Sequence, residues 1–322
     1  MPTPNELADT LLAKATTLRT TADQLTATAA QVRLITPAPP APPAPPAWTP
    51  RFPGDTKPGT IRLGSAYGSN TDPGNRYGAT PGVRRTFVPD WSKRMSLVTI
   101  AKADHAAGRL PWVSTKVNVP AIARGTASIL VELDAFIVAL RDLRKPVILG
   151  VSHEPEDNVI KSKEFTAAQW CTVQVRVREV IVKAGAKNIC FATPLMSWTW
   201  NAGSGRNPAD YWPGLGVWDA LAVDAYQKTE SGVAVPLMKE WTALTAFAKT
   251  KGLPVIVGEW GQRGTDTAKL SAAYDEFIAQ GVPVVAWFDT ELNGGYPLSG
   301  AMLAEFSELV KDQRSVDLID QP

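Results

Sequence analysis

The 322-residue chain contains only two histidines and two cysteines, which closes off several common chemistries. Two residues of each type cannot build a Cys₄ or His₃ zinc site without carboxylate ligands, and we predict neither a metal nor a cofactor. Cys171 and Cys190 are too few for a disulfide framework and are expected to be buried thiols. Neither histidine lies in an arrangement with serine or cysteine that indicates a nucleophilic triad.

The chain also has no marked excess of charge and no long apolar run. Lys and Arg number 33 against 31 Asp and Glu, a net charge of +2, which argues against a broad nucleic-acid surface. No run of 18 apolar residues occurs, so no membrane-spanning helix is expected. The N-terminus lacks the basic start and apolar core of a secretory signal peptide. A protein of this kind that works outside a cell would have to travel by another route.

The first 35 residues are expected to form a separate helical segment. Over residues 5–35, two sets of small or apolar residues each recur every seven positions, offset by three: Ala8, Ala15, Ala22, Ala29 and Leu11, Leu18, Leu25, Val32. Four heptads of this pattern are typical of a coiled coil. We therefore predict a stalk for oligomerisation or assembly. The alternative is a lone helix that docks on its own domain.

A proline-rich segment follows the heptad region. Nine prolines occur between residues 36 and 53. Because proline fixes φ and removes a hydrogen-bond donor, this stretch is expected to form neither helix nor sheet. We predict a stiff polyproline spacer over residues 36–58, at about 3.1 Å per residue. The alternative interpretation is a ligand for an SH3-type domain.

Residues 59–322 show a repeated strand-then-helix rhythm. The expected strands are 60–67, 83–88, 110–117, 146–152, 188–194, 218–226, 253–259 and 282–289. Amphipathic helices are expected between them, with Thr166 and Asp266 as N-caps and Gly185, Gly252 and Gly281 as stops. Eight such units within about 257 residues predict an α/β fold, the (β/α)₈ TIM barrel. A doubly wound sheet would also alternate, but it would normally need a phosphate-binding glycine loop, and none is present.

Acidic residues stand where the chemistry of such a barrel is found, at the C-terminal ends of strands. Glu154 follows the fourth expected strand and Glu259 ends the seventh. A buried, unpartnered glutamate is costly, so two facing glutamates indicate a function. Cleavage of a glycosidic bond needs such a pair, one carboxyl holding a proton and the other ionised. Glu156 is a rival for the proton-holding role, and structural ion pairs are the alternative for both glutamates.

Aromatic side chains near the same strand ends fit a sugar ligand, because the apolar faces of sugars pack on indole rings. The indoles expected near loops on this side are Trp112, Trp198, Trp200, Trp212, Trp260 and Trp287. His153 and the neighbouring indoles could supply the environments that separate the two glutamate pKa values. Asp224 and Asp289, also at strand ends, are more typical of hydrogen-bond anchors or loop caps. His153 could equally be a structural residue that holds its loop.

The strand-end residues resemble those of the clan A glycoside hydrolases. Glu154-Pro155 after the fourth strand, Glu259 after the seventh and Trp287 on the eighth carry this resemblance. The pair His153-Glu154 is more specifically similar to glycoside hydrolase family 26, whose members include β-mannanases. The resemblance covers roughly residues 59–315 and implies a retaining mechanism, with Glu154 as acid/base and Glu259 as nucleophile.

The same resemblance assigns supporting roles. It implies that Tyr226 donates a hydrogen bond to the nucleophile, that Arg85 lies near the nucleophile, and that Trp287 forms the aromatic platform under the sugar. The sequence departs from the family after His-Glu, where Pro155-Glu156-Asp157-Asn158 replaces a Met-Asn-Gly-like stretch. Mannan specificity is therefore not assumed.

The layout of the whole chain resembles minor tail proteins of phages that infect actinobacteria. A heptad helix, a proline-rich spacer and the segment 52–55 (Phe-Pro-Gly-Asp) lead into a hydrolase-like barrel. This resemblance implies location on a virion and partners in a phage tail. Two functions stay open: a retaining hydrolase that cleaves a β-linked polysaccharide, and a non-catalytic glycan-binding or structural tail module that keeps the barrel.

Overall fold

The computed structural model describes residues 3–35, 48–68 and 70–318. The described chain forms two units, of which the first consists of helix α1 (Pro4–Ile35) and the second begins at Trp48. Most of the predicted polyproline spacer, residues 36–47, lies outside the described residues. Within the part of the chain that the structure describes, no helix is both long and apolar enough to cross a membrane.

Helix α1 confirms the helix predicted over residues 5–35. Threonine hydroxyls along it donate hydrogen bonds to carbonyl oxygens four residues earlier, as Thr16 does to Leu12 at 2.9 Å. The leucines of the heptad seam are solvent-exposed: Leu18 is 71% and Leu25 66% exposed. Over residues 3–30, where the structure describes side-chain burial, the helix therefore buries no apolar face.

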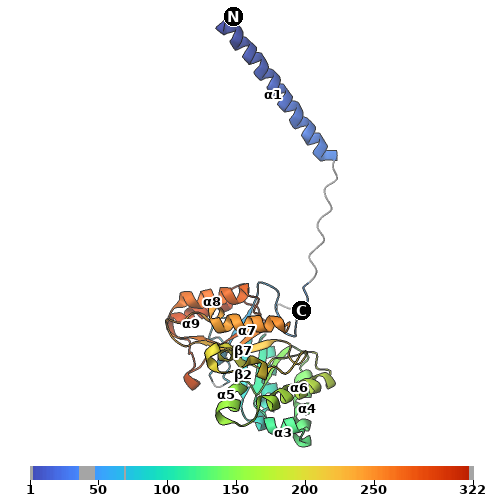
Figure 1. The fold of residues 1–322 in the computed structure, drawn as a ribbon, viewed down its shortest axis with the longest axis vertical. Coiled ribbons are helices and arrows are strands. Elements are labelled where there is room, and N and C mark those ends of the chain that lie inside the picture. Colours follow the sequence, from blue (N-terminus) through green and yellow to red (C-terminus); the bar gives the residue numbers. More distant parts are fainter. Residues whose placement is uncertain (1–2, 36–47, 69, 319–322) are drawn as a thin grey trace. The chain divides into compact units, whose positions relative to one another are not determined.

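The second unit is a barrel of parallel strands (Figure 1). The strands are β1 (Arg62–Tyr67), β2 (Val83–Val88), β3 (Leu110–Thr115), β4 (Val147–Val151), β5 (Ile189–Phe191), β6 (Leu195–Met196), β7 (Leu221–Gln227), β8 (Val255–Gln262) and β9 (Val284–Asp289). Their order is β5-β4-β3-β2-β1-β9-β8-β7-β6. Because β5 and β6 are two pieces of one segment, this order runs round a closed circle, and the predicted (β/α)₈ barrel is confirmed.

Helices cover the outside of the barrel. They are α2 (Met95–Ala106), α3 (Val119–Arg124), α4 (Ala127–Arg141), α5 (Pro155–Asp157), α6 (Ala167–Lys183), α7 (Lys239–Thr250), α8 (Thr267–Ala279) and α9 (Gly300–Lys311). Figure 1 shows α8 and α9 on one side and α3, α4 and α6 on the other, with β2 and β7 between them. The predicted caps are present: Thr166 forms a capping box with Gln169, and Asp266 accepts a hydrogen bond from the backbone of Lys269.

Two apolar layers hold the barrel together. The larger lies between strands and helices, and the smaller fills the barrel interior with residues such as Trp112, Ile148 and Ala222. Phe52 is 3% exposed and packs into the interior layer. The backbone oxygen of Gly54 accepts a hydrogen bond from Arg62 Nε at 2.9 Å. Residues 48–58, which the sequence analysis assigned to the spacer, therefore group with the second unit.

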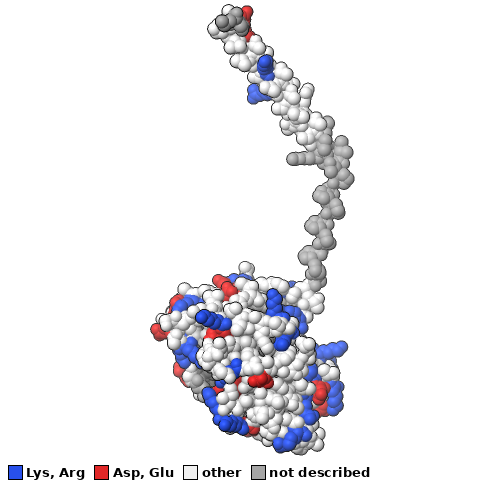
Figure 2. Space-filling view, in the orientation of Figure 1, with Lys and Arg blue, Asp and Glu red and all other residues white. Residues whose placement is uncertain are grey.

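Both cysteines are free thiols, and of the two only Cys190 is fully buried as predicted. Cys190 is buried, Cys171 is half-buried, and neither forms a disulfide. Figure 2 shows basic and acidic side chains interspersed over the visible face of the barrel domain.

Candidate active site

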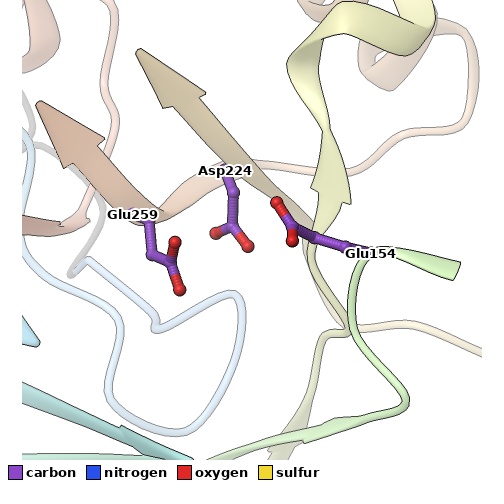
Figure 3. A group of neighbouring side chains, drawn as sticks. All are labelled: Glu154, Asp224 and Glu259. Atoms are coloured by element: carbon purple, nitrogen blue, oxygen red, sulfur yellow. The ribbon is translucent and has the colours of Figure 1, made fainter. Parts of the chain in front are cut away.

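Three carboxyl groups converge from β7, from β8 and from the segment that follows β4. They belong to Glu154, Asp224 and Glu259, and Figure 3 shows the side chains reaching toward one shared space. One oxygen of each lies within 4.8 Å of one oxygen of both others. The structure thus brings together the two glutamates that the sequence analysis singled out, 105 positions apart in the chain.

A β-bulge in β8 turns Glu259 into the barrel. Val223 of β7 pairs with Val257, but the next residue, Asp224, pairs with Glu259, so β8 has one extra residue here. Val257 belongs to the outer apolar layer, and strict alternation would point Glu259 outward as well. The extra residue reverses the alternation and re-aims the carboxylate at the site.

Gly258, the residue at the bulge, leaves room for an ion pair. A Cβ at this position would lie 2.7 Å from Asp224 Oδ1 and closer still to Arg85 Nη1. Arg85 is buried on β2 and donates to both oxygens of Asp224, with Nη2–Oδ2 at 3.1 Å. Only a residue without a side chain allows this close approach.

The same guanidinium also reaches Glu259. Arg85 Nη2 lies 3.3 Å from Glu259 Oε1, and the Tyr226 hydroxyl donates a hydrogen bond to Oε2. A cation and a hydroxyl donor on opposite oxygens fix the orientation of a carboxylate and stabilise its charge. Arg85 and Tyr226 therefore occupy the positions that the resemblance implied, and Asp224 anchors Arg85.

Glu154 has a different environment. Burial, the neighbouring Glu259 and then Glu156 raise the pKa of Glu154 to about 8, against the weaker opposing effect of Arg85. Its backbone is held in a left-handed conformation, with φ at 48°, and its N–H donates to the Pro194 oxygen at 2.8 Å. Such backbone conformations cost roughly 1–3 kcal/mol for residues other than glycine and are enriched at functional sites. Glu154 thus holds a proton at neutral pH.

His153 faces the site as a neutral ring. Burial, with the nearby Arg85 and Lys116, lowers the pKa of His153 well below its usual value. Its Nδ1 is buried and has no hydrogen-bond partner among the residues that the structure describes, and its ring centre lies 5.8 Å from that of Phe87. The side chain lines the cavity, which a purely loop-holding histidine would not need to do.

Two adjoining cavities meet at the carboxyl groups. The first has a volume of about 380 Å³ and is lined by Phe87, His153, Glu154, Tyr226, Lys228, Glu259, Phe288, Gly294 and Tyr296. The second has a volume of about 300 Å³ and includes Met196, Trp198, Asp224, Gln227, Val233 and Glu240. Glu154, Tyr226 and Lys228 line both, so the cavities form one cleft with Glu154 near its middle.

Five of the six indoles expected to face a sugar line neither cavity of this cleft. Trp112 is fully buried inside the barrel, and Trp260 and Trp287 lie in the outer layer, where their rings stack edge-to-face at 4.8 Å. The prediction that Trp287 forms the platform is therefore corrected. Ala286 faces the barrel interior, so alternation points Trp287 outward and Phe288 into the cleft.

Of the other predicted aromatic and acidic residues, some line the cleft and some pack or form hydrogen bonds outside it. Trp198, in the turn Ser197–Trp200, is 42% exposed and lines the second cavity, whereas Trp200 is 8% exposed and packs on Phe247. Trp212 likewise packs on Phe247. Asp289 accepts hydrogen bonds from Arg76, Tyr77 and the backbone of Leu298, as expected of an anchor.

Glu156, the rival for the proton-holding role, lies outside both cavities. It is fully buried, and its Oε1 accepts hydrogen bonds from the backbone N–H of Met196 at 2.9 Å and from Thr199 Oγ1 at 2.7 Å. Burial raises its pKa to about 7. These contacts hold the turn that carries Trp198, which makes Glu156 a positioning residue.

The aromatic residues that the sequence analysis missed are Phe87, Phe288 and Tyr296. The Tyr296 ring stacks on that of Tyr226, with ring centres 5.0 Å apart. Phe87 shares the inward side of β2 with Arg85, so position on the strand could have identified it. Tyr296 follows β9 in a loop, and no sequence pattern marks it.

The three converging carboxyls are also a possible set of metal ligands. Arg85, however, pairs with Asp224 and Glu259, so a cation already occupies the position between these two groups. A second cation there would have to displace the buried guanidinium, and we assign no metal to this site.

Comparison with solved structures places the barrel among known folds. A family 26 β-mannanase from Bacteroides ovatus superposes with a TM-score of 0.59 at 17% identity, over 82% of this chain and 92% of that chain. A β-mannanase from a protist symbiont of the termite Reticulitermes speratus gives 0.59 at 14% identity, over 85% and 97%. A modular endo-β-1,4-mannanase of family 26 from Cellulomonas fimi gives 0.58 at 17%, over 82% and 73%.

These similarities show that the chain has the fold of family 26 and other clan A glycoside hydrolases. No protein-family model matches the sequence, and no curated protein matches it either.

Proposed function

We propose that the protein is a retaining glycoside hydrolase that acts on a β-linked polysaccharide. The observation that carries the proposal is the convergence of Glu154 and Glu259 oxygens to within 4.8 Å. Retaining enzymes place their two carboxyls about 5–5.5 Å apart, whereas inverting enzymes leave about 6.5–9.5 Å for a water molecule. The solved β-mannanases that share the fold support the same class of reaction.

The two glutamates divide the chemistry according to their environments. Glu154, with its pKa raised to about 8, donates its proton to the oxygen of the leaving sugar. Glu259, oriented by Arg85 and Tyr226, attacks the anomeric carbon as the glycosidic bond breaks and forms a covalent glycosyl-enzyme. The Glu154 carboxylate then takes a proton from water, whose oxygen displaces Glu259 from the sugar, and both groups return to their starting states.

The cleft supplies binding on both sides of the bond. The first cavity surrounds Glu259 with Phe87, Phe288 and Tyr296 and would hold the sugar that forms the covalent intermediate. The second cavity presents the exposed ring of Trp198, on which a leaving sugar can stack. Because the cleft continues through both cavities, we propose action within a polymer.

Azide rescue of two alanine variants tests the proposal. On aryl β-glycosides, azide should restore Glu259→Ala activity with formation of the α-glycosyl azide, because azide attacks the face that the missing carboxylate used. In Glu154→Ala, azide should attack the glycosyl-enzyme and give the β-glycosyl azide. Glu156→Gln serves as the control and should keep most of its activity.

A panel of soluble β-glycans and cell-wall polysaccharides, assayed for release of reducing ends, would identify the substrate. Unchanged hydrolysis by Glu259→Ala would refute the proposal. Binding of a polysaccharide without any release of reducing ends would favour the glycan-binding module instead.

We further propose that α1 assembles with other helices through its heptad seam. The exposed seam leucines support this, because a continuous apolar stripe in water favours association. Second copies of this chain are the proposed partners. Location on a virion, with phage tail partners, stays a prediction from the layout of the sequence.

A further inference from the structure

Lys228 is a cation in the middle of the cleft that the proposed chemistry does not use. It lines both cavities, together with Glu154 and Tyr226. Among the described residues, none forms an ion pair or hydrogen bond with Lys228, and its ammonium nitrogen lies over the Trp198 ring, 5.8 Å from the ring centre. A charged side chain at a substrate cleft without a counter-ion is available to a ligand.

The inward face of β7 carries Lys228 to this position. Asp224 and Tyr226 face the site from β7, and Lys228 continues the same alternation one step beyond the end of the strand. Positions two apart on a strand are about 7 Å apart, so Lys228 lies next to the reacting groups and toward the cavity entrance. Its side chain therefore borders the space that a bound sugar chain would occupy.

The backbone around Lys228 is held in place. The Gln227 side chain donates a hydrogen bond to the Thr229 oxygen at 3.0 Å, and the Gln227 oxygen accepts one from the Arg263 N–H at 3.2 Å. Gly232 packs so closely that a Cβ there would lie 2.9 Å from the Thr229 oxygen. These hydrogen bonds and this close packing fix the position of the Lys228 backbone. A lysine in a mobile surface loop has no such fixed backbone position.

The acidic groups of the cleft have other partners. Asp224 and Glu259 pair with Arg85, Glu154 holds a proton at neutral pH, and Glu240 accepts a hydrogen bond from Asn201. None of these carboxyl groups, all of them on described residues, lies within ion-pair distance of the Lys228 ammonium group.

We propose that Lys228 binds an acidic substituent of the substrate, so that the preferred substrate is a β-linked glycan that carries carboxylates or comparable anionic groups close to the cleaved bond. The inference rests on the proposed function and narrows its substrate class. An ammonium and a carboxylate form a charge-assisted hydrogen bond, which a neutral hydroxymethyl group at the same position cannot replace.

Matched oligosaccharides test this charge preference directly. The probes are pentasaccharides of β-1,4-mannuronate and of β-1,4-glucuronate, each compared with its carboxyl-reduced form, β-1,4-mannopentaose or cellopentaose. Binding is measured by titration calorimetry on the full chain with Glu259→Gln, which prevents turnover. At least one acidic probe should bind about tenfold more tightly than its reduced form, the size expected for one charged hydrogen bond.

Variants at Lys228 locate the effect. Lys228→Met should remove the preference for the acidic probe, and Lys228→Arg should retain most of it. Lys251→Met is the matched control, because Lys251 also lies over an indole, 5.5 Å from the Trp212 ring centre, but lines neither cavity. The preference should also weaken at high salt.

The outcomes separate this inference from the proposed function. The inference would be overturned if the acidic probes bind no more tightly than their reduced forms, or if neither kind of probe binds. It would also be overturned if the preference for the acidic probe survives in Lys228→Met. Hydrolysis of neutral β-glycans with no preference would overturn it while the proposed function stands. Lys228-dependent binding of the acidic probe without hydrolysis of any glycan would support it while the proposed function fails.

Discussion

Glu154→Gln should make the protein more stable at alkaline pH while it removes hydrolysis. The folded protein keeps the Glu154 proton to about pH 8, whereas an unperturbed glutamate releases it near 4.5. A carboxyl whose pKa is raised by folding contributes stability that is fully present below pH 4.5 and is lost as the pH rises to 8. Glutamine stays neutral, so the variant has no such loss.

The magnitude follows from the difference between the two pKa values. At about 1.4 kcal/mol per pKa unit, a change from 4.5 to about 8 amounts to roughly 5 kcal/mol. Because the Glu154 side chain borders the cleft and is partly open to solvent, we expect about 2–3 kcal/mol. At pH 9 the variant should therefore exceed the unmodified protein by this amount in free energy of unfolding, and at pH 4.5 the two should be nearly equal.

Guanidinium unfolding followed by tryptophan fluorescence at pH 4.5, 7 and 9 measures this difference. Glu179→Gln, an exposed position on α6, is the control and should show no pH-dependent gain. The kcat/KM of the unmodified protein should fall above pH 8, as the acid loses its proton. If the free energies of unfolding of the unmodified protein and Glu154→Gln fall in parallel from pH 4.5 to 9, burial does not hold the proton on Glu154 and its assignment as the acid is refuted.

Two further substitutions test the framework. Gly258→Ala should push the Arg85 guanidinium away from Asp224 and lower the free energy of unfolding by about 3 kcal/mol or more, as breaking a buried ion pair does. The control, Gly203→Ala, should lower the free energy of unfolding by less than about 1 kcal/mol. Equal losses of stability in the two variants would contradict the steric argument. In α1, Leu18→Lys should dissociate the assembled chain in analytical ultracentrifugation, whereas Thr20→Lys, off the seam, should not; a monomer before substitution would contradict the proposed stalk.

The positions of the strands could be predicted from the sequence because strands buried on both faces form short continuous apolar runs. Each of the eight expected runs overlaps a strand of the barrel. The fifth differs in one respect: the strand β5 stops before Pro194, the last residue of the expected run, and the strand resumes beyond it as β6. Proline cannot donate to a strand ladder, which accounts for the interruption.

The direction of each strand-end side chain could not be predicted for the same physical reason. In a strand buried on both faces, apolar residues occupy the inward and outward positions alike, so alternation does not reveal which set faces the interior. Trp287 and Phe288 on β9 are both apolar and aromatic, and the sequence offered no basis for choosing between them. The family resemblance favoured the tryptophan, and the structure turns the phenylalanine toward the cleft.

Glu259 shows how a local irregularity decides the chemistry. Its place at a strand end could be predicted, but regular alternation from Val257 would have pointed it into the layer of helices, where an ionised carboxylate has no partner. Gly258 is the residue that marks the exception, because a glycine inside a strand often indicates a bulge or a close approach of neighbouring groups. Here it does both, since the bulge turns Glu259 inward and the missing side chain leaves space for Arg85. Gly258, and not Glu259 alone, therefore allows β8 to contribute a carboxylate to the candidate active site.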